Sequence, residues 1–212
     1  MSSDVEFEIP SWDEIYEMLL NIADKIRRDG FNPDLIVGIC RGGWPPARIM
    51  SDLLDNPRLT NISVEFYVDV AKTKSQPVLT QPITVQVDGK RALVLDDVAD
   101  TGKTLKLVKD HLISKGAREV RIATIYYKPW SIVKPDYYEK ETRRWVVFPW
   151  ERKETVRSLM KKHSEEEVRR KLISSGMDTK LVDRFINEIR MKRDTYPPKR
   201  EDNTRRLDQK LC

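Results

Sequence analysis

The chain has 212 residues, a formal net charge of +5 and 39% hydrophobic residues. These values suit a globular protein with one sizeable core, and the charge suggests anionic partners such as phosphates or nucleotides, although a basic solvated surface would give the same total. No run approaches the roughly 18 apolar residues of a membrane span, and we expect no signal peptide, because the first residues lack a basic stretch followed by an apolar run. Cys40 and Cys212 lack metal-ligand spacing, so we expect a cytoplasmic protein without a structural disulfide.

The first third of the chain reads as helix, strand and helix. Ser11 and Glu14 form a capping box, which predicts a helix over residues 12–28. The apolar run 35–39 predicts a strand covered on both faces. A second helix is expected over residues 45–54, because the two prolines at its start are tolerated in a first turn.

The middle of the chain continues the alternation. Residues 61–90 are interpreted as two strands that flank a mobile loop. The apolar runs 92–97, 120–127 and 145–148 predict further buried strands, and the periodicity after the first of these predicts a helix over residues 103–115.

The composition changes from about residue 151. Ser164 and Glu167 form another capping box, whose helix ends at Gly176, and a further helix is expected over 179–193. The polar tail after it is expected to be extended or poorly ordered. Together these elements predict an α/β fold with a mainly parallel sheet flanked by helices and a helical C-terminal extension. Ligands of such sheets sit beyond the carboxyl ends of the strands, where residues 40–43, 96–104 and 128 fall.

The strongest motif runs from Val94 to Thr104, in which a buried strand ends in two acids and a donor-rich turn opens a helix. Consecutive amides of the turn, together with the positive end of the helix, can cradle a phosphate. A Walker A loop is excluded, because Asp97 stands where that motif requires a glycine. Simple helix capping would need one acid, whereas three lie within five residues.

This run resembles the phosphoribosyl diphosphate (PRPP) motif of the type I phosphoribosyltransferases. The resemblance implies that Asp96 and Asp97 contact the ribose hydroxyls and can hold Mg²⁺, directly or through water. It implies that the turn binds the 5′-phosphate and that Asp100 is the general base near N7 of a purine. The turn consists of Asp100, Thr101, Gly102, Lys103 and Thr104. Lys103 departs from the small residue often found in the family.

Residues 38–43 (GICRGG) resemble the diphosphate loop of the same family. Arg41 would then supply charge to the leaving diphosphate, while Gly42 and Gly43 let backbone amides approach it. Family members often hold a cis peptide that does not involve proline in this loop. By itself, the glycine pair could be a tight turn. The interpretation as a diphosphate loop is supported by the acidic motif, which follows downstream in the order expected for the family.

The third set of residues resembles the xanthine-guanine phosphoribosyltransferases of bacteria. The resemblance implies that Lys128 donates to O6 of the purine, Trp145 stacks on its ring and the backbone of Val146 meets its edge. A cation with an aromatic platform suits an oxo-purine better than the 6-amino group of adenine. The alternatives are a solvated surface lysine at Lys128 and core packing for Trp145 and Trp150.

The resemblance implies a transferase domain over 1–151, including a base-binding hood, and an extension over 152–212. Its expected ligands are PRPP, a purine base, the nucleoside monophosphate and diphosphate, with Mg²⁺ as cofactor, in a homo-oligomer that binds neither membrane nor nucleic acid. Residues 66–82, with Lys72 and Lys74, are expected to close over the site. Open alternatives are a phosphoribosyltransferase for another base, or a PRPP-sensing regulator that binds nucleic acid through its basic tail. The preferred 6-oxopurine, nucleotide regulation and the role of the extension stay open.

Overall fold

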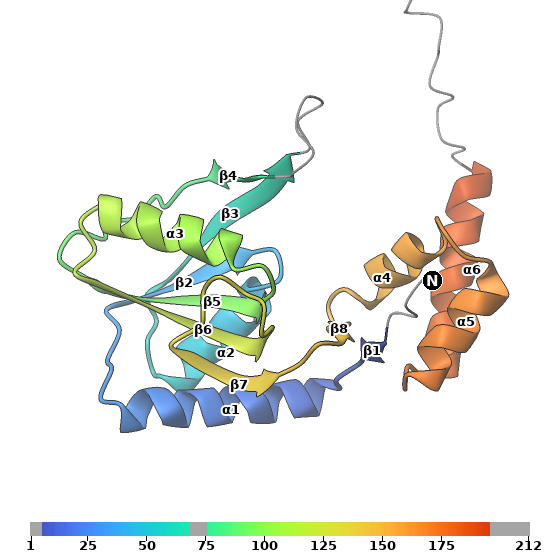
Figure 1. Ribbon diagram of the computed structural model, residues 1–212, viewed down its shortest axis with the longest axis horizontal. Helices are drawn as coiled ribbons and strands as arrows, with labels where there is room; N and C mark the ends of the chain where they lie inside the picture. The colour runs from blue at the N-terminus through green and yellow to red at the C-terminus, as the bar shows by residue number, and fades with distance from the viewer. Residues whose placement is uncertain (1–5, 68–75, 196–212) are drawn as a thin grey trace, which may run out of the picture. The chain divides into compact units, whose positions relative to one another are not determined.

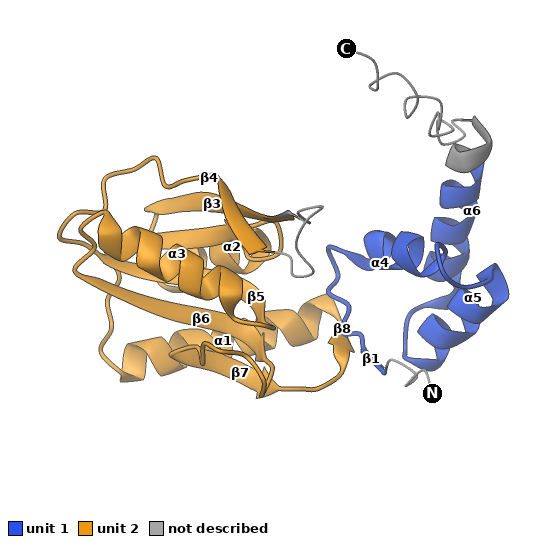
Figure 2. Cartoon of the chain, turned by 45° about the horizontal axis from the view of Figure 1, so that its top comes forward, with its two compact units in different colours: residues 1–9, 146–212 blue, residues 10–145 orange. Residues whose placement is uncertain are grey.

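The computed structural model describes residues 6–67 and 76–195 of the chain. These residues form two compact units, shown in different colours in Figure 2. The larger unit comprises residues 10–145, and the smaller one contains residues 6–9 together with 146–195. Two expectations lie outside the described residues: the centre of the closing segment, which includes Lys72 and Lys74, and the polar tail.

The larger unit is built on a sheet whose described strands follow the order β4-β3-β2-β5-β6-β7 (Figure 1). Parallel pairing joins β3, β2, β5, β6 and β7, whereas β4 is the antiparallel hairpin partner of β3. The strands are β2 (Leu35–Cys40), β3 (Leu59–Tyr67), β4 (Gln76–Gln81), β5 (Arg91–Ala99), β6 (Glu119–Tyr127) and β7 (Tyr137–Glu141). The fold predicted from the sequence, a mainly parallel sheet with flanking helices, is confirmed.

Helices cover both faces of this sheet, which explains why its central strands are apolar runs (Figure 1). On one face, α3 (Lys103–Ser114) buries Leu105, Val108 and Leu112 against alternate strand residues such as Val37 and Val94. On the other face lie α1 (Trp12–Arg28) and α2 (Trp44–Leu53), which contact each other. The capping box of α1 is present as predicted, since Ser11 and Glu14 bond each other's backbone amides.

Strand β7 is attached to α1 by polar contacts. Lys25 Nζ and Glu139 Oε2 lie 2.6 Å apart, and the Tyr137 hydroxyl donates to Asp29 Oδ2 at 2.6 Å. Burial, and then the bond to Asp29, raise the pKa of Tyr137 to about 12. The guanidinium of Arg121 also bonds Asp29 and Tyr137, so this edge strand is fixed by a network rather than by an apolar run.

The smaller unit has its own apolar core. It contains α4 (Arg152–Leu159), α5 (Glu165–Ser174) and α6 (Thr179–Thr195), with the strand β1 (Phe7–Glu8) pairing with β8 (Trp145–Val146). Val168 and Leu172 of α5 are fully buried and pack with Val156 of α4 and Val182 of α6. Ser164 and Glu167 form the predicted capping box of α5. The predicted helical extension is therefore present.

Two predictions about elements differ from the structure. The run 145–148 is not a fourth core strand. Its first two residues pair with β1, and Val147 packs in the core of the smaller unit, which is called the helical unit below. The strand that lies beside β6 at the edge of the large sheet is β7, which the sequence analysis did not predict. Helix α4 was not predicted either. The boundary between residues 151 and 152 stays a prediction, since the division into compact units falls after residue 145.

Candidate active site

The candidate residues gather where three neighbouring strands end. β2, β5 and β6 are adjacent and parallel, with Gly38 opposite Leu95 and Asp96 opposite Thr124. Their carboxyl ends therefore meet at one edge of the sheet, and the segments 40–43, 96–104 and 128–133 follow from that edge. The sheet thus brings together three segments that are spread over residues 40 to 133 of the sequence.

The loop after β2 lies directly against the acidic end of β5. A β-carbon on Gly42 would lie 2.0 Å from Asp97 Oδ2, and one on Gly43 would lie 2.3 Å from the carbonyl oxygen of Leu95. The neighbours of Gly43 are backbone atoms that cannot rotate away, so only glycine fits there, whereas a side chain at Gly42 would have to displace the Asp97 carboxylate. The peptide bond between Cys40 and Arg41 is cis, which confirms the expectation for this loop. Arg41 itself is exposed at the rim.

The two acids at the end of β5 are consecutive residues, of which Asp97 is 9% exposed and Asp96 is half-buried. The Asp97 side chain accepts from the amide of Val98 at 2.8 Å, and Asp96 Oδ1 accepts from the amide of Asp97 at 3.0 Å. Burial, and then the neighbouring charge of Asp97, raise the pKa of Asp96 well above its ordinary value. A cation or a set of hydroxyl donors at this point would therefore be favoured.

The turn from β5 to α3 has the form of an anion cradle. Gly102 adopts φ +76°, in the left-handed region, and α3 begins at the next residue. Gly102 is the N-cap and brings no side chain to the amides of the first turn, which also carries no acidic residue. The amide of Lys103 donates to Thr101 Oγ1 at 3.4 Å, whereas the N-cap supplies no side-chain acceptor to the other amides of the first turn, so the positive helix end can attract an anion.

The predicted base-binding residues come from β6 and from the segment before β8. Lys128 is 5% exposed, and its Nζ donates to the carbonyl oxygen of Arg144, the residue directly before Trp145. Trp145 is 56% exposed. These values exclude both alternatives, a solvated lysine and a core tryptophan. Val146 is buried and is the first residue of the other unit. Trp150, for which core packing was also considered, stacks on Phe148 with ring centroids 5.0 Å apart.

Sequence reasoning missed the segment that follows Lys128. The amide of Ile132 donates to the carbonyl oxygen of Thr101 at 3.1 Å, and the indole Nε1 of Trp130 donates to Asp100 Oδ1 at 3.0 Å. This segment therefore lies against the turn 100–104. The exposed Trp130 close behind Lys128 was the available signal, but nothing in the spacing indicated its partner.

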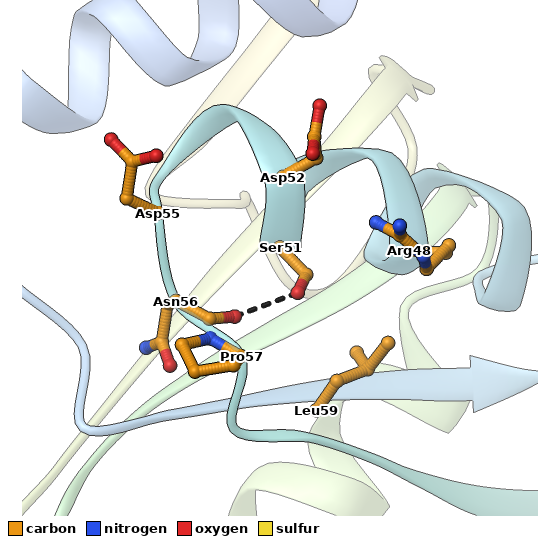
Figure 3. Close-up of a pocket in the computed structure, with 7 residues that line it drawn as sticks. All are labelled: Arg48, Ser51, Asp52, Asp55, Asn56, Pro57 and Leu59. Atoms are coloured by element: carbon orange, nitrogen blue, oxygen red, sulfur yellow. Dashed lines mark hydrogen bonds between the residues drawn. The ribbon is translucent and has the colours of Figure 1, made fainter.

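A cleft of about 400 Å³ lies at the opposite end of the sheet, between the end of α2 and the start of β3 (Figure 3). The hydroxyl of Ser51 there donates to the carbonyl oxygen of Asn56 at 2.6 Å. None of the candidate residues lines this cleft, whose residues are Arg48, Ser51, Asp52, Asp55, Asn56, Pro57 and Leu59.

The described part of the chain contains neither a metal-binding cluster of side chains nor a membrane-spanning helix. In residues 6–67 and 76–195, no group of three or more His, Cys, Asp or Glu side chains could hold a metal ion. Any metal at the two acids of β5 would therefore need oxygens from substrate or water. Within the same ranges, no helix combines the length and apolar character that crossing a membrane requires.

The fold is that of an α/β protein whose three candidate loops lie at the carboxyl edge of its sheet. A family model described as phosphoribosyl transferase domain matches residues 11–157. The xanthine-guanine phosphoribosyltransferase of Cereibacter sphaeroides is 33% identical over 148 residues, which cover 66% of this chain and 84% of that protein. The corresponding Ruegeria protein is 33% identical over 153 residues, covering 66% and 83%.

Two solved structures similar to this chain are also phosphoribosyltransferases. The purine phosphoribosyltransferase of Pyrococcus horikoshii shares 39% identity and a TM-score of 0.63, covering 68% of this chain and 93% of that one. A Helicobacter pylori xanthine-guanine-hypoxanthine phosphoribosyltransferase, at 21% identity and a TM-score of 0.63, covers 74% and 100% and supports the fold. The chain belongs to the phosphoribosyltransferase family, as its motifs predicted.

Proposed function

We propose that this chain is a purine phosphoribosyltransferase of purine salvage. It transfers the 5-phosphoribosyl group of PRPP to a 6-oxopurine and releases the nucleoside monophosphate and diphosphate. The observation that carries the proposal is the meeting of a half-buried and a buried acid, a helix start whose N-cap brings no side chain, and a buried lysine at the ends of β5 and β6. The names of the relatives, which are xanthine-guanine and purine enzymes, support the substrate class.

The sugar and both phosphate groups of PRPP are assigned to two loops. Asp96 and Asp97 hold the ribose hydroxyls, and the turn 100–104 holds the 5′-phosphate on the amides of α3. Arg41 neutralises the diphosphate, whose oxygens can approach the backbone of Gly42 and Gly43 because these residues have no side chains. The absence of room for β-carbons there supports this assignment.

The acids of β5 fit a magnesium ion. Mg²⁺ prefers oxygen ligands and usually takes one or two carboxylates together with substrate phosphates and water. Asp96 and Asp97 offer such a pair, directly or through water. Burial, and then the charge of Asp97, raise the pKa of Asp96, and a cation there would favour its charged form. Bound there, magnesium supplies neutralisation of the diphosphate charge.

The base is assigned to Lys128, Trp145 and Val146. Lys128 donates to O6 in place of its bond to the Arg144 carbonyl, Trp145 stacks on the ring, and the backbone of Val146 meets the base edge. The exposed face of Trp145 supports the stacking role. Adenine would present an amino donor to the lysine, which disfavours it.

The reaction replaces one bond at C1 of the ribose by another. The bond from C1 to the diphosphate oxygen breaks with its electron pair, and N9 of the purine forms the new bond to C1. Asp100 accepts the proton that the purine loses at N7. Such general base catalysis typically contributes about 10²- to 10⁴-fold.

The decisive experiment incubates the protein with PRPP, Mg²⁺ and each purine or pyrimidine base in turn, and measures nucleotide formation. We expect turnover with hypoxanthine, guanine or xanthine and little with adenine or uracil. Asp100→Asn should lower kcat by about 10²-fold or more. Asp110→Asn is the matched control, because Asp110 lies on α3 but pairs with Lys106 at the surface. No turnover with any base would refute the enzyme and favour the regulator.

We also propose that the protein works in the cytoplasm as a homo-oligomer, without nucleic acid or membrane as a partner. Sedimentation of the full chain should then give a mass at least twice the monomer's 24.9 kDa. A monomer at micromolar concentration would contradict this part of the proposal.

A further inference from the structure

The segment after β6 is packed tightly onto the phosphate turn. Besides the bond from the Ile132 amide to Thr101, a β-carbon on Gly102 would lie 2.5 Å from Ser131 Oγ and 2.7 Å from the amide nitrogen of Val133. The hydroxyl of Ser131 in turn donates to the carbonyl oxygen of Val133 at 2.9 Å. The segment 128–133 and the turn 100–102 are therefore held in a fixed relation by backbone contacts.

Trp130 projects from this segment onto the proposed general base. Its indole Nε1 donates to Asp100 Oδ1 at 3.0 Å. Within residues 6–67 and 76–195, this indole is the one hydrogen-bond partner of the Asp100 side chain. Asp100 is exposed, so without that bond its carboxylate would rotate among several orientations. With the bond, one oxygen is occupied and the other is left for the purine.

The same indole also lies beside the proposed base-recognition lysine. Lys128 Nζ is 5.6 Å from the centroid of the Trp130 ring, within the range of a cation–π contact. Lys128 is assigned to O6 and Asp100 to N7, and these two atoms lie on the same edge of a 6-oxopurine. One side chain therefore contacts both groups that have to match that edge.

We infer that Trp130 is a positioning residue, which rests on the function proposed above. Its indole N–H fixes the orientation of the Asp100 carboxylate, and its ring fixes the spacing between that carboxylate and the Lys128 ammonium. The general base is thereby held ready for N7 before the purine binds, which is the kind of preorganisation that a proton transfer requires. Trp130 does not itself exchange a proton.

The test uses Trp130→Phe in the full chain, because phenylalanine keeps an apolar ring beside Lys128 but removes the N–H donor. We expect kcat with the best 6-oxopurine to fall about 10-fold, the order expected for a hydrogen bond to a charged group. The KM for PRPP and the midpoint of thermal unfolding should stay unchanged. Trp12→Phe is the matched control, since Trp12 is also about half exposed but lies at the start of α1; it should leave kcat unchanged.

A double-mutant cycle distinguishes an effect of Trp130 on the Asp100 carboxylate from an effect on kcat that is independent of Asp100. If the indole acts through the carboxylate, Trp130→Phe should have almost no effect on kcat in the Asp100→Asn background. A full 10-fold loss in that background, or a wild-type kcat for Trp130→Phe alone, would overturn the inference while leaving the proposed function intact. If the unchanged protein forms no nucleotide with any base, the proposed function fails first and the inference fails with it.

Discussion

Replacing Gly43 by alanine tests how closely the diphosphate loop and the acidic strand depend on each other. The added β-carbon would lie 2.3 Å from the carbonyl oxygen of Leu95 and 2.8 Å from the Cα atom of Asp96. Both are backbone atoms of a buried strand, so no side chain can rotate away. Separations under 3.0 Å are essentially never seen for real β-carbons, so the loop has to retreat from β5 by about 0.7 Å.

The size of the effect follows from that displacement. A misplacement of about 1 Å can cost about 100-fold in rate, so we expect kcat/KM for PRPP to fall roughly 30- to 100-fold in Gly43→Ala. Overpacking of this kind should also lower the free energy of unfolding by about 1 to 3 kcal/mol. The measurements are initial rates at saturating purine with varied PRPP, and urea unfolding followed by circular dichroism.

Gly89→Ala provides the control. Gly89 has φ +67°, yet a β-carbon there would meet nothing within 4 Å. Alanine should therefore cost about 1 kcal/mol of stability through backbone strain, with kcat/KM unchanged. If Gly43→Ala kept the kcat/KM of the unchanged protein, the loop would not be placed by its contact with β5. The assignment of residues 41–43 to the diphosphate would then lose its structural support.

Three further predictions concern the base, the pH dependence and the helical unit. Lys128→Met should raise the KM for the 6-oxopurine about 10-fold or more and change the KM for PRPP little, as steady-state kinetics would show. Hydrogen bonds from Arg91 lower the pKa of Asp34 to about 2, so its contribution to stability is present above pH 4 and is lost as the pH falls toward 2. Because this pair is about one-third exposed, we expect a loss of about 1 kcal/mol relative to Asp34→Asn, measured by urea unfolding between pH 5 and 2. Leu172→Ala should cost about 2 to 5 kcal/mol, and hydrogen exchange should place that loss in residues 146–195; an equal loss across the sheet would contradict the separate core.

The parts of the fold that the sequence predicted are those with local causes. The capping boxes at Ser11 and Ser164 depend on side chains three residues apart, and both are present. The apolar runs of β2, β5 and β6 follow from helices on both faces of the sheet. The run 145–148 shows the limit of that signal, because it indicates burial but not the partner.

The features that the sequence did not predict depend on contacts between distant residues. The sequence of β7, YYEKE, has no apolar run, and side chains of the strand bond Lys25 of α1 and its C-cap residue, Asp29. The bond from Trp130 to Asp100 joins residues thirty positions apart, and it exists because β5 and β6 are neighbours in the sheet. Family resemblance supplied the loops themselves, and it carried no information on a tryptophan at that position.

The arrangement of the site explains why glycine recurs in it. The central strands are fully buried at Leu93 and Leu95, so the end of β5 is a rigid reference point between two loops. Gly43 lets the loop after β2 approach that point from one side, and Gly102 lets the segment after β6 approach it from the other. A larger residue at either position would keep every proposed chemical group and still separate the groups from one another. The geometry of the reaction therefore depends on residues that have no functional side chain of their own.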